Sequence, residues 1–431
     1  MTSSSSVLIT SVGVTVVWVI VLTVVSIMLA AAEPQDSEAR ALLESGWWNG
    51  YVNNTANHCR WPGVKCNHDG SVIEISLPYY YYYEEKTLTK MNFSAFPNLL
   101  RLDLNNKGFS GSIPPGLGHL TKLRKLSLGS NQLNGSIPPE IGKLHNLGTL
   151  NLCSNFLSGS IPQEFGDMKN LSFLRIDKNQ LSGPLPPTLG LLSKLKHLNL
   201  QENQISGSIP SEIGNMKGLI YLNMVQNQIN GSIPLEIGNL KNLAYLDLGS
   251  NHLEGSIPGE IGKAKSLKFL NLGKNRLSGL IPFQIGRLSM LSEFYVDGNF
   301  ISGEMPFQLG NLKNLQTLNL SHNNFTGNIP RDIGKAKSLK FLNLEQNRFS
   351  GPIPFQIGRL SMLLKFYIDH NFISGEIPSE LGNLTNLLTL DLSHNRLTGL
   401  IPPALLHLTN LNSLYLDSNI LEGHIPGDIG N

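Results

Sequence analysis

The sequence has no surplus of charge of either sign, because 33 Lys and Arg residues face 31 Asp and Glu residues. This balance excludes the basic surface that binding to nucleic acid or to an anionic membrane requires. Potential metal ligands do not cluster at ligand spacing, and no Gly-rich phosphate loop occurs. Ser, His, Asp and Glu show no convergence toward a nucleophile with its base or toward paired carboxylates. We therefore expect no enzyme, no metal site and no cofactor.

What the sequence does have is a repeat. The pattern L-x-x-L-x-L-x-x-N-x-L-x-G-x-I-P recurs fourteen times at a fixed spacing of 24 residues. Most of the 42 glycines and 24 prolines fall at repeat-fixed bends, so a disordered chain is excluded. The copies begin at Leu99, Leu123, Leu147, Leu171, Leu195, Leu219, Leu243, Leu267, Leu291, Leu315, Leu339, Leu363, Leu387 and Leu411.

This unit resembles the leucine-rich repeat, in which each copy adds one short strand to a continuous sheet. The resemblance implies an α/β-type repeat solenoid, a plant-type leucine-rich repeat superhelix with a parallel concave β-sheet and an N-terminal cap. Strand alternation turns Leu126 and Leu128 of the second copy inward, and bends bring in Leu123, Leu133 and Ile137. Since one copy cannot bury its own core, stability depends on neighbours on both sides.

The Asn of each repeat is predicted to be structural. Asn131 and its successors through Asn419 stand where the strand turns away, and a buried amide can pair backbone groups that the bend leaves unpaired. Only the first copy differs, with Lys107 in this position. We interpret Lys107 as a tolerated irregularity beside the cap.

The N-terminus carries an apolar run from Val12 to Ala32 without a charged residue, and no Lys or Arg precedes Arg40. Three alanines at its end fit signal-peptidase cleavage, so we predict a signal peptide; the alternative is an uncleaved membrane anchor. The division that follows is a signal peptide at 1–32, a cap and Tyr-rich linker at 33–98, and fourteen repeats at 99–431, the last one incomplete and uncapped. We expect the protein to enter the secretory pathway and to reside in the apoplast or at the plasma membrane surface.

The segment before the array reads as an end cap, with Trp47-Trp48, the stretch Cys59 to Cys66 and an apolar strand at Val72 to Leu77. Together with Met91 to Leu99 and the recurring I-P-x-x-[IL]-G element, it resembles the ectodomains of plant leucine-rich repeat receptor-like kinases. Similarity is greatest to the male-discoverer-interacting receptor-like kinase 2 group and covers about residues 38 to 431. Two departures are the run Tyr79 to Tyr83 and the end of the chain inside its fourteenth repeat, so phosphotransfer by a kinase domain cannot be assigned to these residues.

With Cys59 and Cys66 paired as a disulfide in the cap, Cys153 is left over. We place Cys153 on the solvent side of its strand, as either an ordinary unpaired residue or a thiol that joins another chain. Eight N-x-[ST] sequons mark candidate glycosylation sites. They are Asn53, Asn92, Asn134, Asn170, Asn230, Asn319, Asn324 and Asn383.

Ligand-binding residues are sought in the outward columns, which lie two, four, six and seven residues after the first Leu of each repeat. The column two residues after the first Leu carries a ring side chain on five successive strands: Phe173, His197, Tyr221, Tyr245 and Phe269. The charged residues that border this stripe are Arg175, Asp177, Lys178, Glu202, Asp247 and Lys274. Tyr295, Phe341 and Tyr367 extend this stripe, which crosses about 38 Å of sheet and suits an extended peptide of about 12 residues. The alternative is that the rings only stiffen the sheet by cross-strand packing.

Function is predicted from this surface and from the resemblance. Related plant receptors hold secreted peptides on the concave face and recruit a short leucine-rich repeat co-receptor kinase. We expect an extracellular ectodomain that binds a peptide or protein in signalling or defence, and no nucleic acid. The alternatives are a secreted inhibitor of a pathogen wall-degrading enzyme and a truncated, non-signalling receptor fragment. His370 and His394 share an outward column, with His322 two repeats earlier, which suggests a second hypothesis of acid sensitivity.

Overall fold

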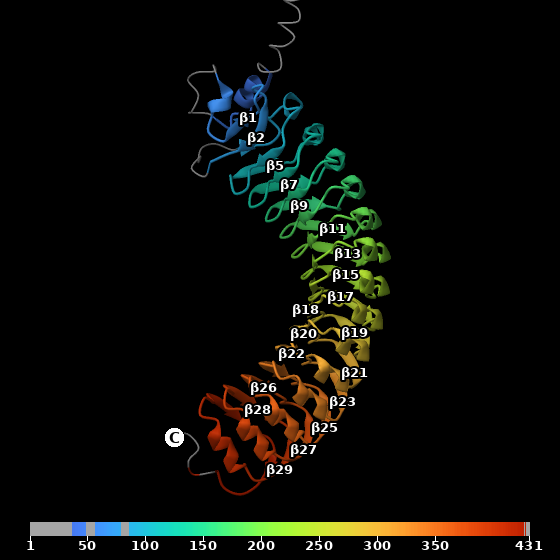
Figure 1. Cartoon of the computed structure of the whole chain (residues 1–431), viewed down its shortest axis with the longest axis vertical. Helices are drawn as coiled ribbons and strands as arrows, with labels where there is room; N and C mark the ends of the chain where they lie inside the picture. The colour runs from blue at the N-terminus through green and yellow to red at the C-terminus, as the bar shows by residue number, and fades with distance from the viewer. Residues whose placement is uncertain (1–36, 49–56, 79–85, 426, 428–431) are drawn as a thin grey trace, which may run out of the picture.

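The computed structural model describes residues 37–48, 57–78, 86–425 and 427. The repeats stack in chain order into a single curved solenoid (Figure 1), which confirms the predicted solenoid class. The predicted signal peptide, the tyrosine run and Asn53 lie outside the described residues. Within the described residues, no helix has the length and apolar character needed to cross a membrane.

The first sheet lines the concave side and has sixteen strands among the described residues. β1 and β2 are antiparallel, and the repeat strands that follow β2 are parallel and in register at 24-residue spacing. Its strands are β1 (Val64–Cys66), β2 (Val72–Ser76), β4 (Arg101–Asp103), β6 (Lys125–Ser127), β8 (Thr149–Asn151), β10 (Phe173–Arg175), β12 (His197–Asn199), β14 (Tyr221–Asn223), β16 (Tyr245–Asp247), β18 (Phe269–Asn271), β20 (Glu293–Tyr295), β22 (Thr317–Asn319), β24 (Phe341–Asn343), β26 (Lys365–Tyr367), β28 (Thr389–Asp391) and β30 (Ser413–Tyr415).

A second parallel sheet has fifteen strands among the described residues, and in the repeats its strands follow the Asn. The sequence pattern did not predict this sheet. Each repeat strand from β5 to β29 buries one apolar side chain, as Leu133 does in β7, so the sequence shows no alternating pattern that would predict these strands. Its strands are β3 (Lys86–Thr87), β5 (Phe109–Ser112), β7 (Gln132–Ser136), β9 (Phe156–Gly159), β11 (Gln180–Pro184), β13 (Gln204–Ser208), β15 (Gln228–Gly231), β17 (His252–Gly255), β19 (Arg276–Gly279), β21 (Phe300–Glu304), β23 (Asn324–Gly327), β25 (Arg348–Gly351), β27 (Phe372–Glu376), β29 (Arg396–Gly399) and β31 (Ile420–Leu421).

In repeats one to thirteen the convex side is a 3₁₀ turn of five residues that starts after the Pro of the I-P element. The helical part of the predicted α/β-type unit is therefore a 3₁₀ helix throughout the described array. The 3₁₀ helices, including two in the cap region, are η1 (His58–Arg60), η2 (Phe93–Ala95), η3 (Pro115–His119), η4 (Pro139–Lys143), η5 (Gln163–Asp167), η6 (Pro187–Leu191), η7 (Ser211–Asn215), η8 (Leu235–Asn239), η9 (Gly259–Lys263), η10 (Phe283–Arg287), η11 (Phe307–Asn311), η12 (Arg331–Lys335), η13 (Phe355–Arg359), η14 (Ser379–Asn383) and η15 (Pro403–His407).

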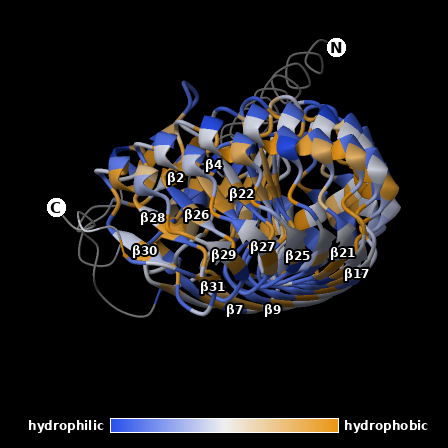
Figure 2. Cartoon of the chain, turned by 90° about the horizontal axis from the view of Figure 1, so that it is seen from below, coloured by the Kyte–Doolittle hydropathy of each residue, from blue (hydrophilic) through white to orange (hydrophobic). Residues whose placement is uncertain are grey.

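One continuous core runs through the solenoid, and its repeated positions are those predicted from the second copy. Leu123, Leu126, Leu128, Leu133 and Ile137 are all buried. Seen nearly along the solenoid, apolar residues of successive repeats lie one behind another (Figure 2). Each repeat therefore completes the core of its neighbours, as stacking requires.

The Asn column joins consecutive repeats by hydrogen bonds, as predicted. The Asn227 side chain donates to Leu200 O at 3.0 Å and to Met224 O at 3.1 Å. Its Oδ1 accepts from the backbone N of Ile205 at 3.0 Å. Lys107 has no side-chain acceptor to replace the amide oxygen, and it is half-buried beside the cap. Its own backbone N donates to the Asn131 side chain.

The cap closes the N-terminal end of the core. Residues 37–44 are helical, and Glu38 from this helix accepts a hydrogen bond from Val72 N in β2 at 2.9 Å. Trp47 packs edge-on against Phe109 of β5, with ring centroids 4.9 Å apart. At the other end, Leu414 and Leu416 are only partly buried, because no described repeat follows them.

Candidate functional site

The five predicted rings, which lie two residues after the first Leu of their repeats, are side by side on the concave sheet. Strand register pairs Phe173 with His197, His197 with Tyr221, Tyr221 with Tyr245 and Tyr245 with Phe269. Ring centroids of successive pairs are 4.4, 4.2, 4.4 and 4.3 Å apart, and the planes differ by 5° to 13°. We call these five residues the ring ladder.

Stacking determines which part of each ring is free to bind. The three inner rings have both faces covered by neighbouring rings, while every ring of the ladder is half-buried. The Tyr245 hydroxyl donates to Asp247 Oδ2 at 3.2 Å, and the Tyr221 hydroxyl accepts from Asn223 Nδ2 at 3.1 Å. The ladder is thus a cross-strand packing unit that leaves a row of ring edges partly exposed. Binding of a peptide to these edges stays a prediction.

The three predicted extensions do not continue the ladder as one stripe. Glu293 occupies the ladder column in the next strand, and Tyr295 tilts against Phe269 with ring centroids 5.7 Å apart. Phe341 and Tyr367 contact each other at 5.9 Å but stand beyond the strand of Thr317. The aromatic surface is therefore one long ladder with Tyr295 at its end, and a separate pair.

The predicted charged border of the ladder is wrong for two residues, Asp177 and Asp247, which are not exposed. Asp177 is fully buried and receives two hydrogen bonds from Arg175, from Nε at 3.0 Å and from Nη2 at 2.9 Å. Asp247 is also buried, and burial raises the pKa of its carboxyl group. Asp177 is in the sixth position, past the end of β10, where alternation no longer applies. Asp247 is in the fourth position, as the last residue of β16, and its Oδ1 accepts a hydrogen bond from Gly249 N at 3.1 Å. Lys178, Glu202 and Lys274 are exposed as predicted.

The position of Cys153 is a second correction, because this residue is only 5% exposed. It also occupies the sixth position, past the end of β8, where it packs over Gly129 of the preceding repeat. A side chain on Gly129 would approach the Cys153 sulfur closely, so the glycine makes room for the thiol. Burial raises the pKa of the Cys153 thiol, and the thiol is not available to another chain.

Sequence reasoning missed a second structural amide column, four residues after the first Leu. In this column Asn or Asp accepts a hydrogen bond from the backbone N two residues later, as Asn199 does from Gln201 at 3.2 Å and Asp391 from Ser393 at 3.0 Å. The signal was the recurrence of Asn and Asp at this position. The seventh position has a left-handed backbone, with φ of 53° at Glu202 and 52° at His370.

Burial and charge distinguish the ladder from its surroundings. Burial lowers the pKa of His197, and Arg175 lowers it further.

Beside the last ring lies a hollow of about 230 Å³ whose polar lining includes Lys274 and Asp297. A larger hollow, about 860 Å³, lies away from the concave sheet along the Ser-Ile-Pro segments of successive repeats. We favour the smaller, concave hollow as a ligand site, because charged and aromatic groups converge there.

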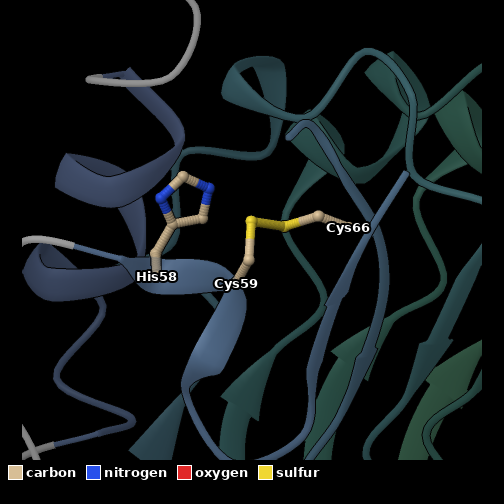
Figure 3. Close-up of side chains that lie close together, drawn as sticks. All are labelled: His58, Cys59 and Cys66. Atoms are coloured by element: carbon tan, nitrogen blue, oxygen red, sulfur yellow. A yellow bond between two sulfur atoms is a disulfide. The ribbon is translucent and has the colours of Figure 1, made fainter. Parts of the chain in front are cut away.

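The cap holds the one trio of potential metal ligands among the described residues, His58, Cys59 and Cys66 (Figure 3). Cys59 and Cys66 form the predicted disulfide, with Cα atoms 5.5 Å apart, so neither sulfur is a thiolate ligand. The His58 ring lies within 3.6 Å of Glu38 Oε2. In this disulfide-bonded state the trio offers no thiolate to a metal ion.

The described sequons differ in accessibility. Asn92, Asn134, Asn170, Asn230 and Asn383 are exposed. Asn319 and Asn324 are half-buried, and Asn319 Oδ1 accepts hydrogen bonds from the backbone N and the hydroxyl of Ser321. Asn319 lies on the concave sheet in β22. Glycosylation at these positions stays a prediction.

Family models cover most of the chain. A leucine-rich repeat region matches residues 81–219, single leucine-rich repeats match 218–240, 242–264 and 266–288, and further leucine-rich repeats match 289–349 and 361–421. The chain is a leucine-rich repeat protein. No curated protein sequence matches it.

Three solved structures illustrate what this leucine-rich repeat protein is similar to. The plant peptide hormone receptor RGFR1 in complex with RGF2 is 31% identical, with a TM-score of 0.61 over 84% of this chain and 72% of that chain. The ectodomain of the Arabidopsis thaliana receptor kinase GASSHO1/SCHENGEN3 in complex with CASPARIAN STRIP INTEGRITY FACTOR 2 is 31% identical, with a TM-score of 0.58 over 92% and 57%. A Leptospira interrogans leucine-rich repeat protein is 34% identical, with a TM-score of 0.60 over 78% and 89%. Since a bacterial protein matches as well as plant receptors do, the fold alone does not determine the function.

Proposed function

We propose that this chain is the extracellular ligand-recognition ectodomain of a plant leucine-rich repeat receptor, and that its concave face binds a peptide or protein in signalling or defence. The ring ladder carries the proposal, because it presents five half-buried ring edges in register on the concave sheet. Similarity to plant receptor ectodomains solved in complexes supports it. The candidate contact residues are Phe173, Arg175, His197, Tyr221, Tyr245, Phe269, Tyr295, Phe341 and Tyr367.

The ladder suits a ligand because its geometry is fixed before binding. Stacked rings lose little conformational freedom when a ligand covers their edges, so less of the binding free energy is lost to ordering. An extended peptide lying across the strands would contact successive ring edges. The hollow beside Lys274 and Asp297 would receive one side chain of that peptide.

The further assignments rest on the resemblance of the sequence. They comprise membership of the male-discoverer-interacting receptor-like kinase 2 group, residence in the apoplast or at the plasma membrane, and a short leucine-rich repeat co-receptor kinase as a second partner. We propose ligand recognition as the role of the repeat array, and we propose no catalytic role for it.

The test is a selection of 12-residue peptides on the purified, secreted protein. We expect the double variant Tyr221→Ala, Tyr245→Ala to bind a selected peptide at least about tenfold more weakly, as loss of central aromatic contacts does. The matched control is Phe300→Ala, Phe372→Ala, which removes two exposed rings from the second sheet. Unchanged binding by the Tyr221, Tyr245 variant, with its fold intact by circular dichroism, would remove the ladder as the binding site.

A further inference from the structure

Positive charge is concentrated along one edge of the solenoid, between the 3₁₀ turns and the concave strands. Thirteen segments of six residues there run from the last residue of each turn to the residue after the first Leu of the next repeat. They carry 17 of the 33 Lys and Arg residues but one of the 31 Asp and Glu residues. The net charge of the chain therefore does not describe this surface.

The middle of this edge has ten cations and no carboxylate. The six consecutive segments that contain them are 239–244, 263–268, 287–292, 311–316, 335–340 and 359–364, and we call their ten Lys and Arg side chains the basic edge. Nine of the ten are exposed. Carboxylates from the turns pair with two of them, Glu260 with Lys263 at 3.9 Å and Asp332 with Lys335. Among the described residues, the other eight lie in no ion pair.

Two turns lack the carboxylate that other turns provide. Glu260 occupies the second position of η9, whereas Gln284 and Gln356 occupy that position in η10 and η13. These two turns end in Arg287 and Arg359. Because glutamine is neutral, both arginines keep their full positive charge at the surface.

Cations of successive repeats come close enough to affect one another. Lys241 Nζ donates a hydrogen bond to the backbone carbonyl of Lys263 at 3.2 Å, and Lys265 Nζ to that of Arg287 at 2.9 Å. Each ammonium group therefore lies at the end of the next turn. Burial lowers the pKa of Lys265, and Arg287 and Lys241 lower it further. Repulsion between these cations is relieved when an anion lies between them.

Exposed aromatic rings beside the edge are the second, independent observation. Phe283 and Phe355 begin the turns that end in Arg287 and Arg359, and they are 51% and 46% exposed. The guanidinium carbons lie 5.7 and 5.9 Å from the two ring centroids. Phe307, at the start of η11, is exposed to a similar extent. The edge thus offers flat apolar surface together with positive charge, which solvation of a charged face does not require.

A linear acidic polysaccharide matches both the charge and the rings. Each unit of a polyuronate carries one carboxylate, and the C–H face of its sugar ring packs on an aromatic ring as other apolar surfaces do. The polymer repeats these two groups along its length, as the solenoid repeats its cations from one turn to the next. Single-stranded nucleic acid also combines charge with flat rings, so it is the alternative that a test must separate.

We infer that the basic edge binds a polyuronate, a linear polysaccharide with one carboxylate on each sugar unit. The cations neutralise the carboxylates, and Phe283 and Phe355 pack against sugar rings. The basic edge shares no residue with the ring ladder, so this is a function beyond peptide recognition. The choice of a polysaccharide over a nucleic acid rests on the proposed extracellular location, whereas the choice of an anionic polymer rests on the surface alone.

The array itself supplies neutral residues for a test. Gln316 stands at the position of Lys268 and Lys340, and Asn311 stands at that of Arg287. The edge variant therefore combines Lys268→Gln, Lys340→Gln and Arg287→Asn. Since each new residue already occurs at its position in another repeat, we expect the variant to fold as the parent does.

Two further variants separate the rings from the charge. The ring variant combines Phe283→Ser with Phe355→Ser, because Ser211 and Ser379 begin other turns. The control variant removes the same charge as the edge variant, but from exposed positions of the second sheet. It combines Arg276→Gln, Arg348→Gln and Arg396→Gln.

The probes are polygalacturonate chains of one length, the same chains with every carboxylate methyl-esterified, and single-stranded oligothymidylate of equal charge. At physiological ionic strength we expect the parent protein to bind polygalacturonate more tightly than either of the other probes, and at least about tenfold more tightly than the esterified chains. The edge variant should weaken the binding of polygalacturonate about tenfold, the ring variant about threefold, and the control variant less than about twofold.

Absence of polygalacturonate binding by the parent, or equal losses in the edge and control variants, overturns the inference. Oligothymidylate bound as tightly as polygalacturonate, or an unchanged affinity of the ring variant, would show a general polyanion surface and overturns the choice of a polysaccharide. Binding of a ladder-selected peptide is measured on the same edge variant, where it should equal that of the parent. Failure of the basic edge and failure of the ladder proposal are thereby distinguished.

Discussion

The phenol ring of Tyr245 stacks on that of Tyr221, with centroids 4.4 Å apart and planes 13° apart. The other face of Tyr245 meets Phe269 at 4.3 Å. We predict that Tyr245→Ala destabilises the surrounding repeats by about 1–3 kcal/mol, since two stacked contacts are lost. Hydrogen exchange in β14, β16 and β18 would measure this. Tyr245→Phe keeps the stack and is the control, and equal protection in the two variants would contradict a structural role for stacking.

The Asn column gives a second prediction. Asn227→Ala should destabilise its repeat by about 2–3 kcal/mol, because it removes the hydrogen-bond partners of buried backbone groups in two repeats. The readout is exchange of the Ile205 amide, which donates to Asn227. Asn239 is exposed at the end of η8, so Asn239→Ala should leave that amide unchanged.

The close approach of successive convex turns gives a third prediction. A Cβ atom on Gly238 would collide with the backbone carbonyl of Glu260 in the next repeat. We predict that Gly238→Ala destabilises the array by at least about 1–3 kcal/mol, as overpacking does. Gly116 has open space at the equivalent atom, so Gly116→Ala should be neutral or slightly stabilising in a urea titration. Similar midpoints for both variants would show that the turns can move apart.

His197 gives a prediction on pH. Because burial lowers its pKa from 6.5 in the folded state, the unfolded chain binds the proton more readily. Its contribution to stability is therefore complete above the unfolded pKa and declines as the pH falls below about 6.5. His197→Phe should keep the stack and lose this dependence. The measurement is the stability difference between variant and parent from pH 8 to pH 5, and a constant difference would exclude the effect.

The sequence predicts those structural features that recur at the same position of every repeat. The inward positions of Leu126 and Leu128 and the bridging role of Asn227 follow from periodicity, because stacking places equivalent residues in equivalent environments. The register of the ladder follows for the same reason. The uninterrupted 24-residue spacing fixes which rings are neighbours.

The errors lie where the strand ends. Cys153, Asp177 and Asp247 were placed outward, yet all three are buried. Cys153 and Asp177 lie past the end of a three-residue strand, where side-chain alternation no longer holds. Asp247 is the last residue of β16, and its Oδ1 accepts hydrogen bonds from Gly249 N at 3.1 Å and Asn271 Nδ2 at 2.9 Å. The buried Arg175–Asp177 pair and the unpaired Asp369 oxygen depend on atomic positions within one bend, which no periodicity specifies.

The most direct test of the concave-face account is the structure of the protein with a selected 12-residue peptide bound. The account predicts that the peptide lies across β10 to β18, with its apolar side chains against the edges of Tyr221 and Tyr245. A peptide bound instead on the convex 3₁₀ turns or along the second sheet, with the ladder left uncovered, would contradict it.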